Sequence, residues 1–254
     1  MKIALLGYGK MGRVIEGLAQ AAGDEIVLRV DESNRGDITA ADLAKADVAI
    51  EFSRPEAAPG NIDLALAAGV PIVVGTTGWL AQLPAISEKV VAAEGALFWA
   101  SNFSVGVNVF FAAAKQLGQL LGQYPGYAAS VEEIHHLQKL DSPSGTAITL
   151  AESFAAGNPA YGSWSLDRVT SIVPQQNIAP AAAPANGEKA VPIHSIREEG
   201  VPGTHLLTLS SGVDTIELKH TAHSREGFAK GALVAANFLR DKKGVFTMED
   251  LLKH

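Results

Sequence analysis

The fold of this chain is decided by the stretch Lys2-Ile3-Ala4-Leu5-Leu6-Gly7-Tyr8-Gly9-Lys10-Met11-Gly12. Residues 2–6 are predicted to form a buried strand, and the glycines follow it in the spacing G-x-G-x-x-G. In such a turn the first glycine permits the tight bend, the second lets the backbone approach a pyrophosphate, and the third lets the next helix pack closely. That helix, expected over residues 10–22, offers free N–H groups to phosphate oxygens at its start. The stretch therefore predicts dinucleotide binding by Gly7, Tyr8, Gly9, Lys10, Met11 and Gly12.

The same alternation of strand and helix continues through the first hundred residues. Strands are predicted over residues 26–30, 47–52, 71–74 and 96–99, with helical stretches between them. Near-continuous apolar strands that alternate with helices are typical of a parallel sheet covered on both faces. Asp31 follows the second strand, where a carboxylate accepts hydrogen bonds from the adenosine ribose. We therefore expect a doubly wound, Rossmann-type domain with Asp31 in its cofactor site.

The pattern changes after residue 104. Helices are expected over 105–121 and 144–155 around a strand at 128–136, whereas 157–189 is rich in Pro, Ala, Asn and Gly and is predicted to be mostly loop. Strands at 191–197, 205–210 and 214–220 alternate apolar and polar residues, which is typical of an antiparallel sheet open on one face. A helix at 228–239 and a short one that begins with a capping box at 247–250 end the pattern.

These elements predict two domains. Residues 1–104 and 222–254 are expected to form the dinucleotide-binding domain, because the apolar face of the helix at 228–239 needs a partner there. Residues 105–221 are expected to form an inserted α+β domain with an open, mainly antiparallel sheet.

Composition narrows the function classes. With 47% hydrophobic residues the chain can bury a sizeable core, and without cysteine it has no disulfide, thiolate metal site or cysteine nucleophile. The apolar run near the N-terminus is too short for a signal peptide, and no stretch approaches the roughly 18 apolar residues of a membrane span. A net charge of −7 argues against non-specific nucleic-acid binding. We expect a cytoplasmic protein with no nucleic-acid or membrane partner.

The most informative stretch is Glu132-Glu133-Ile134-His135-His136-Leu137-Gln138-Lys139-Leu140-Asp141-Ser142-Pro143-Ser144-Gly145-Thr146-Ala147. Two histidines end a strand, so their side chains should face opposite ways, and a lysine follows in the loop. A helix then begins with Pro143 in its first positions, and its N–H groups and hydroxyls make an anion site. The run supplies a proton-transfer group, a cation and a carboxylate cradle.

Other interpretations of this stretch remain. Adjacent histidines suggest zinc, but their opposite directions and the lack of an evident third ligand argue against a metal, so none is expected. The simplest alternative is two loop histidines followed by a helix cap. Glu132 and Glu133 are interpreted as strand-face or hinge residues, because glutamates are usually solvated.

The stretch resembles the signature of the dihydrodipicolinate reductases, also called 4-hydroxy-tetrahydrodipicolinate reductases: a strand-end E-x-H-H, a lysine, and then D-x-P-S-G-T-A. The segments Gly75-Thr76-Thr77-Gly78 and 100–108 are also similar to the family, as is the region 220–232 with Arg225, Phe228 and Gly231. The resemblance therefore extends over essentially the whole chain, with the histidine–lysine run as its specific part.

The resemblance implies a role for each part. It implies a homotetramer that reduces a small cyclic dicarboxylate with NADH or NADPH: hydride addition to a conjugated imine, after loss of the 4-hydroxyl, leaves an enamine that needs a proton. His135 and Lys139 would be the catalytic acid–base candidates, and which of them gives the proton stays open. The substrate carboxylates would bind to Lys139 and to His136, Ser144, Gly145 and Thr146. The nicotinamide end would be lined by Gly75, Thr76, Thr77, Ala100, Ser101, Asn102 and Phe103.

The expected choice between NADH and NADPH depends on a residue that differs from the pattern of some family members, directly after Asp31. Some members of the family have an arginine directly after the acidic residue of the second strand, suited to the 2′-phosphate of NADPH. Here Glu32 occupies that place and adds a second carboxylate beside Asp31, so we expect NADH to be preferred. Arg35 and Lys10 are the cations that a 2′-phosphate could recruit instead.

Two rival functions share this pattern. One is another two-domain NAD-dependent dehydrogenase, although a semialdehyde enzyme acting through a thioester is excluded by the absence of cysteine. The other is a non-catalytic NAD(H)-sensing regulator, since fold does not imply function. The presence of His135 and Lys139 in the expected motif counts against the regulator.

Overall fold

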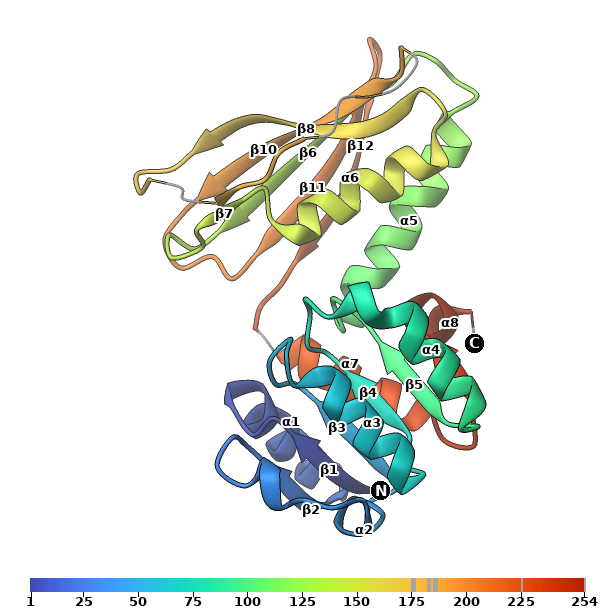
Figure 1. Ribbon diagram of the computed structural model, residues 1–254. Coiled ribbons are helices and arrows are strands. Elements are labelled where there is room, and N and C mark those ends of the chain that lie inside the picture. The colour runs from blue at the N-terminus through green and yellow to red at the C-terminus, as the bar shows by residue number, and fades with distance from the viewer. Residues whose placement is uncertain (175–176, 182–183, 185–186, 225, 254) are drawn as a thin grey trace. The chain divides into compact units, whose positions relative to one another are not determined.

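The computed structural model describes residues 1–174, 177–181, 184, 187–224 and 226–253 (Figure 1). The chain forms two compact units, Met1–Val105 with Glu226–His254, and Gly106–Arg225. Arg225 itself, part of the expected family-like tail, lies outside the described residues. No helix in the described ranges is long and apolar enough to cross a membrane.

The first unit contains a parallel sheet, sheet A, with the strand order β13-β5-β4-β3-β1-β2. Its strands are β1 (Lys2–Leu6), β2 (Glu25–Val30), β3 (Val48–Glu51), β4 (Ile72–Val74), β5 (Ala96–Trp99) and β13 (Gly244–Phe246). Its helices are α1 (Lys10–Ala21), α2 (Ala40–Leu43), α3 (Ala58–Ala68), α4 (Leu83–Ala92), α7 (Glu226–Phe238) and α8 (Met248–Leu252).

Alternate residues of each strand in sheet A enter two different cores. Ile3 and Leu5 pack with residues of α1, α7 and α8 on one face, whereas Ala4 and Leu6 pack with residues of α3 and α4 on the other. Burial on both faces explains the near-continuous apolar strands. The predicted Rossmann-type sheet is confirmed, and β13 extends it at the β5 edge with a strand that the sequence analysis did not anticipate.

The second unit contains sheet B, with the strand order β12-β11-β6-β10-β8. Its strands are β6 (Ala128–His135), β8 (Tyr161–Thr170), β10 (Lys189–Arg197), β11 (Thr204–Ser210) and β12 (Thr215–Thr221); β7 (Asp141–Ser142) and β9 (Asn177–Ile178) form a separate small pair. α5 (Val105–Leu121) and α6 (Gly145–Gly157) share one core with the sheet, and Figure 1 shows α6 along it.

Sheet B corrects two expectations. It is mixed rather than mainly antiparallel, because β10 runs parallel to both β6 and β8, while β11 runs antiparallel to β6 and β12. The stretch that was expected to be mostly loop contains β8, whose sequence YGSWSLDRVT is largely polar. A strand at the edge of a sheet buries less surface, so the backbone pairing with β10 holds it without a strong apolar pattern.

The inward face of sheet B is apolar at one end and polar at the other. Val131, Ile193 and Leu207 are fully or almost fully buried in the core. At the polar end the strand register places side chains opposite one another in a row across β12, β11, β6 and β10, formed by His220, His205, Glu133 and Ser195. The next pair along β6 and β10 is His135 and Arg197.

Candidate active site

The three glycines of the turn between β1 and α1 have different surroundings. Gly7 has φ +103, and a Cβ on it would lie 2.1 Å from the carbonyl oxygen of Phe52 at the end of β3. A Cβ on Gly12 would lie 2.5 Å from the Gly7 carbonyl oxygen, so this position permits close packing of α1. A Cβ on Gly9 would meet nothing within 4 Å, which leaves open space at the start of α1.

The region after β2 is strongly polar. The carboxylate of Asp31 accepts hydrogen bonds from the backbone N–H of Ser33 (2.8 Å) and from its hydroxyl (2.6 Å), which lower the pKa of Asp31. Glu32 forms an ion pair with Arg54. Arg35 donates from Nε to Asn61 Oδ1 at 2.6 Å, so its guanidinium is held at α3.

The loops after β4 and β5 begin at the same carboxyl edge of sheet A as the glycine turn. A Cβ on Gly75 would lie 2.1 Å from the Phe52 ring, and Thr76 Oγ1 accepts from Ser53 N at 2.8 Å. Thr77 and Ser101 are exposed, whereas Ala100 is buried. Phe103 lies in the core against Phe52 and Phe98, so its side chain is a packing residue.

In the second unit, Glu133 connects the end of β6 to the start of α6. Its Oε1 accepts hydrogen bonds from Ser144 N (3.0 Å) and Ser195 Oγ (2.7 Å) and forms an ion pair with Arg197 at 3.0 Å. Both charged side chains of this ion pair have 0% exposure. Burial alone would raise the pKa of Glu133, but hydrogen bonds from His135 and Ser144 and the charge of Arg197 hold it well below its usual value.

Arg197 holds the loop that carries Lys139. It donates to the carbonyl oxygens of Lys139 (3.2 Å) and Asp141 (2.6 Å) and to the hydroxyl of Ser142 (2.8 Å). The ammonium of Lys139 lies 2.9 Å from Asp141 Oδ1 and its side chain is 24% exposed. Arg197 therefore fixes the loop that carries Lys139, and the Lys139 side chain stays partly exposed to solvent.

The start of α6 differs in one respect from expectation. Ser144 is the N-cap, and its hydroxyl accepts from Ala147 N at 3.2 Å, so Pro143 precedes the helix and does not occupy its first positions. Both the N–H and the hydroxyl of Ser144 are engaged inside the protein. Gly145 and Thr146 belong to the first turn of α6, whose N–H groups have no intrahelical acceptor and are therefore available as donors to an anion.

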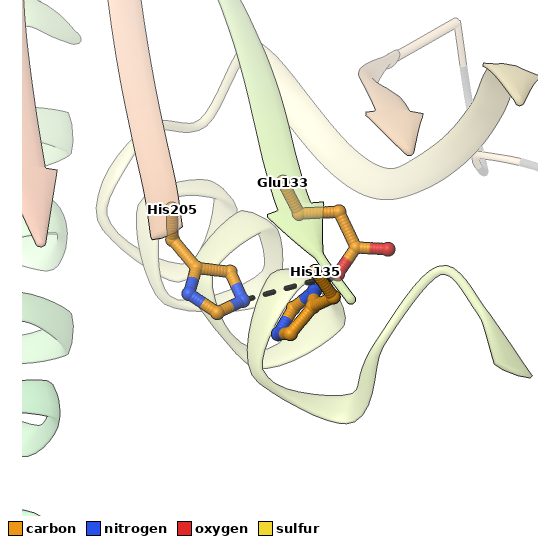
Figure 2. Close-up of side chains that lie close together, drawn as sticks. All are labelled: Glu133, His135 and His205. Carbon is orange, nitrogen blue, oxygen red and sulfur yellow. Dashed lines mark ion pairs between the residues drawn. The ribbon is translucent and has the colours of Figure 1, made fainter. Parts of the chain in front are cut away.

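Two histidines meet at Glu133 (Figure 2). His135 Nδ1 lies 3.2 Å from Glu133 Oε2, and His205 Nε2 lies 3.8 Å from the same oxygen. The rings of His135 and His205 are edge to face, with centroids 5.0 Å apart. Burial, together with the neighbouring His135 imidazole, lowers the pKa of His205 to about 3, so His205 is neutral and its Nε2 can accept from Ser144 Oγ at 3.2 Å.

The sequence showed no evident third ligand beside the adjacent histidines, but the fold brings Glu133 and His205 next to His135. Glu133, His135 and His205 offer ligand atoms within 4.8 Å of one another. Glu133 Oε1 is paired with Arg197, and Oε2 faces the two imidazole rings, so the cluster is a polar network centred on Glu133. His136 lies just past the end of β6, and its carbonyl oxygen accepts from Lys139 N at 3.1 Å.

Three members of the network, Glu133, Arg197 and His205, were not among the expected site residues. Strand alternation could have identified Glu133, because it places Glu133 and His135 on the same face of β6 as the buried core residue Val131. Arg197 and His205 come from other strands, and their places depend on strand register.

Comparison with known proteins places nearly the whole chain in one family. Residues 1–103 match the family model described as dihydrodipicolinate reductase, N-terminus, and residues 106–252 match the model for its C-terminus. A 4-hydroxy-tetrahydrodipicolinate reductase from Christiangramia forsetii is 46% identical over 99% of this chain and 98% of its own length. One from Methanosarcina barkeri is 36% identical over 82% of this chain and 74% of its own length.

Solved structures show the same fold. A dipicolinate-bound dihydrodipicolinate reductase from Paenisporosarcina sp. TG-14 superposes with a TM-score of 0.76 over 97% of each chain, at 22% identity. A probable dehydrogenase from Thermotoga maritima reaches a TM-score of 0.59 at 10% identity and covers 99% of this chain and 92% of its own.

Proposed function

Because the chain belongs to the dihydrodipicolinate reductase family of oxidoreductases, we propose that it reduces 4-hydroxy-tetrahydrodipicolinate to tetrahydrodipicolinate with NADH or NADPH, in diaminopimelate and lysine biosynthesis. The observation that carries this proposal is the buried Glu133–Arg197 pair, which holds His135, the Lys139 loop and the start of α6 in one unit. Oxidation of NADH by the purified protein with freshly generated substrate tests it. A protein that binds NADH and oxidises none of it under these conditions would be a sensor of the cofactor and not a reductase.

The first unit fits a dinucleotide. The open space at Gly9 suits a pyrophosphate at the start of α1, and Asp31 follows the neighbouring strand as a ribose acceptor requires. When bound, the nicotinamide supplies the hydride. We propose that Gly7 to Gly12 hold the phosphates, Asp31 the ribose, and Gly75 to Thr77 with Ala100 to Asn102 the nicotinamide end, with Phe103 contributing through its backbone.

The second unit fits a dicarboxylate. We propose that the N–H groups of Gly145 and Thr146, the Thr146 hydroxyl and His136 bind the substrate carboxylates, with Lys139 as the nearby cation. Ser144 acts by capping the helix that presents these donors. A cationic Lys139 polarises the conjugated imine, and Lys139 or His135 delivers the proton that the product needs. Lys139 and the N–H groups at the start of α6 are the local groups that would attract an anion to a chain of net charge −7.

We expect pyridine-2,6-dicarboxylate to bind the NADH-loaded enzyme and to compete with substrate, because it presents two carboxylates in a plane. Thr146→Val should weaken this binding by roughly tenfold, the size of a lost hydrogen bond to a charged group. Thr149→Val, one turn further along α6, is the matched control and should bind as the wild type does. Titration calorimetry measures both; an unchanged affinity in Thr146→Val would remove that residue from the substrate site.

We expect the kcat/KM for NADH to exceed that for NADPH by roughly 3- to 10-fold at low salt, because Asp31 and Glu32 are exposed carboxylates that repel a 2′-phosphate. The ratio should shrink as salt screens these charges. Glu32→Gln should improve NADPH use, since it removes one carboxylate and releases Arg54. A clear NADPH preference at low and moderate salt would contradict this expectation and would identify Arg54 or Lys10 as the phosphate partner, because Arg35 is held by Asn61.

We further propose a homotetramer in the cytoplasm, in which residues 106–225 bind substrate and mediate assembly. Because α5 and α6 share the core on the inward face of sheet B, the outward face is the one that we propose for assembly. It carries half-buried polar side chains such as Glu132 and His194. Light scattering of the purified protein gives its mass directly.

A further inference from the structure

Glu133 is a buried carboxylate whose two oxygens have separate surroundings. Oε1 contacts Ser144 N at the start of α6, Ser195 Oγ on β10, and the Arg197 guanidinium. Through Arg197 this oxygen is connected to the backbone carbonyl of Lys139. One side of a single carboxylate therefore fixes two parts of the candidate substrate site.

The other oxygen, Oε2, faces the imidazole rings. It lies 3.2 Å from His135 Nδ1, and within the described ranges neither of these two atoms has a hydrogen-bond partner elsewhere. A proton on Nδ1 would satisfy both buried atoms at once, as buried polar groups require. The opposite edge of the ring, at Nε2, lies against Gly203, where a Cβ would come within 3.1 Å. The ring is therefore confined between the carboxylate and the backbone at Gly203, just before β11.

Within the part of the chain that the structure describes, the charged and titratable groups that share the inward face of sheet B with His135, or follow it in the loop after β6, come from four elements. They are Arg197 on β10, His205 on β11, His220 on β12, and Lys139 with Asp141 in the loop. Arg197 and Lys139 each have a carboxylate partner, and burial lowers the pKa of both His205 and His220. His135 Nδ1, at 3.2 Å, lies nearer to Glu133 Oε2 than His205 Nε2 does, at 3.8 Å.

We propose that Glu133 is the positioning residue of the active site: through Oε1 it fixes the Lys139 loop and the start of α6, and through Oε2 it keeps the proton of His135 on Nδ1. The reactive nitrogen of His135 is then Nε2, and the tautomer is set before substrate binds. A carboxylate that orients an imidazole in this way is a general device in acid–base catalysis. This inference rests on the proposed reductase function and assigns a role within it.

The test is Glu133→Gln, which keeps the side-chain size and removes the charge. We expect kcat to fall roughly 10- to 100-fold, as for other supporting residues, with an unchanged KM for NADH. We also expect the midpoint of the kcat–pH profile to move to lower pH by roughly one unit, because a carboxylate no longer stabilises a protonated ring. A folded variant with the wild-type pH profile would overturn the proposal, since a purely structural role predicts loss of activity without that shift.

Glu132→Gln is a matched control on the same strand. Glu132 lies on the outward face of β6, and its Oε2 is 3.4 Å from His194 Nδ1. It therefore forms a second glutamate–histidine pair, on the opposite face of the sheet from the cluster at Glu133. We expect its kcat and pH profile to equal those of the wild type. A shift of the profile in Glu132→Gln as large as that in Glu133→Gln would show a general effect of charge and would also overturn the proposal.

Two further measurements cover the case in which Glu133→Gln leaves Arg197 unpaired and fails to fold. The double variant Glu133→Gln, Arg197→Met removes both buried charges and should show a displacement in the same direction, but smaller, because loss of the Arg197 cation partly offsets loss of the carboxylate. In the wild-type protein labelled with 15N-histidine, the neutral His135 ring should carry its proton on Nδ1; a proton on Nε2 would overturn the assignment. The spectrum requires no turnover, so failure to reduce the substrate would refute the proposed function and leave this result standing.

Discussion

Lys139→Ala is expected to lower kcat by roughly 10²–10⁴-fold, the usual contribution of a group that transfers a proton in the transition state. Its ammonium lies 2.9 Å from Asp141 Oδ1 on a loop that Arg197 holds, so the charge sits at a fixed place and is only partly exposed. The KM for NADH should stay unchanged, because the dinucleotide residues belong to the other unit. Steady-state kinetics with both substrates varied separates the two effects.

Lys89→Ala is the matched control for this experiment. Lys89 also pairs with an aspartate, Asp63 at 2.8 Å, but the pair is exposed on the first unit and has no place in the proposed chemistry. Its kcat should equal that of the wild type. His135→Ala should lower kcat as well, and comparison of its pH profile with that of Lys139→Ala identifies the proton donor. Near wild-type turnover in both Lys139→Ala and His135→Ala would show that the catalytic site is elsewhere.

The second large effect is expected at the glycine turn, where two neighbouring substitutions should act in different ways. Gly7→Ala forces a Cβ to within 2.1 Å of the Phe52 carbonyl oxygen at φ +103. We expect it to lower the free energy of unfolding by about 3 kcal/mol or more. For a chain of this length that corresponds to a fall in Tm of roughly 6–12 °C.

Gly9→Ala should fold normally, because φ is −88 at this residue and the new Cβ meets nothing within 4 Å. It should raise the Kd for NADH roughly tenfold or more, since the methyl group occupies the space that the pyrophosphate needs. Differential scanning fluorimetry of the ligand-free variants and fluorescence titration with NADH measure the two effects. Wild-type NADH affinity in Gly9→Ala would mean that the pyrophosphate does not lie over this turn.

Much of the fold could be predicted because its signals are local. The apolar runs that became β1 to β5 are buried on both faces, and the glycine spacing marks the turn between β1 and α1. β8 and β13 escaped prediction for a common reason: both are edge strands, and their pairing partners β10 and β5 are distant in sequence. The mixed character of sheet B was hidden for the same reason, since strand direction depends on the connections.

The candidate site divides in the same way. His135, Lys139 and Thr146 lie within one short run, so spacing alone grouped them. Glu133 was misjudged, because glutamates are usually solvated, although it shares the inward face of β6 with Val131. Arg197 and His205 could not be grouped with them, because the registers of β10 and β11 against β6 are not encoded in any local pattern.

The way in which the first unit is assembled from both ends of the chain has a consequence for biosynthesis. Ala232, Ala235 and Ala236 of α7 fill one face of sheet A, and β13 completes its β5 edge. On the ribosome these elements emerge only after residues 106–225 have been translated. The inserted unit can therefore complete its fold co-translationally, as domains generally do. The dinucleotide unit keeps an uncovered sheet face and an unpaired strand edge until α7 and β13 have been translated, and during this interval a chaperone would have most to protect.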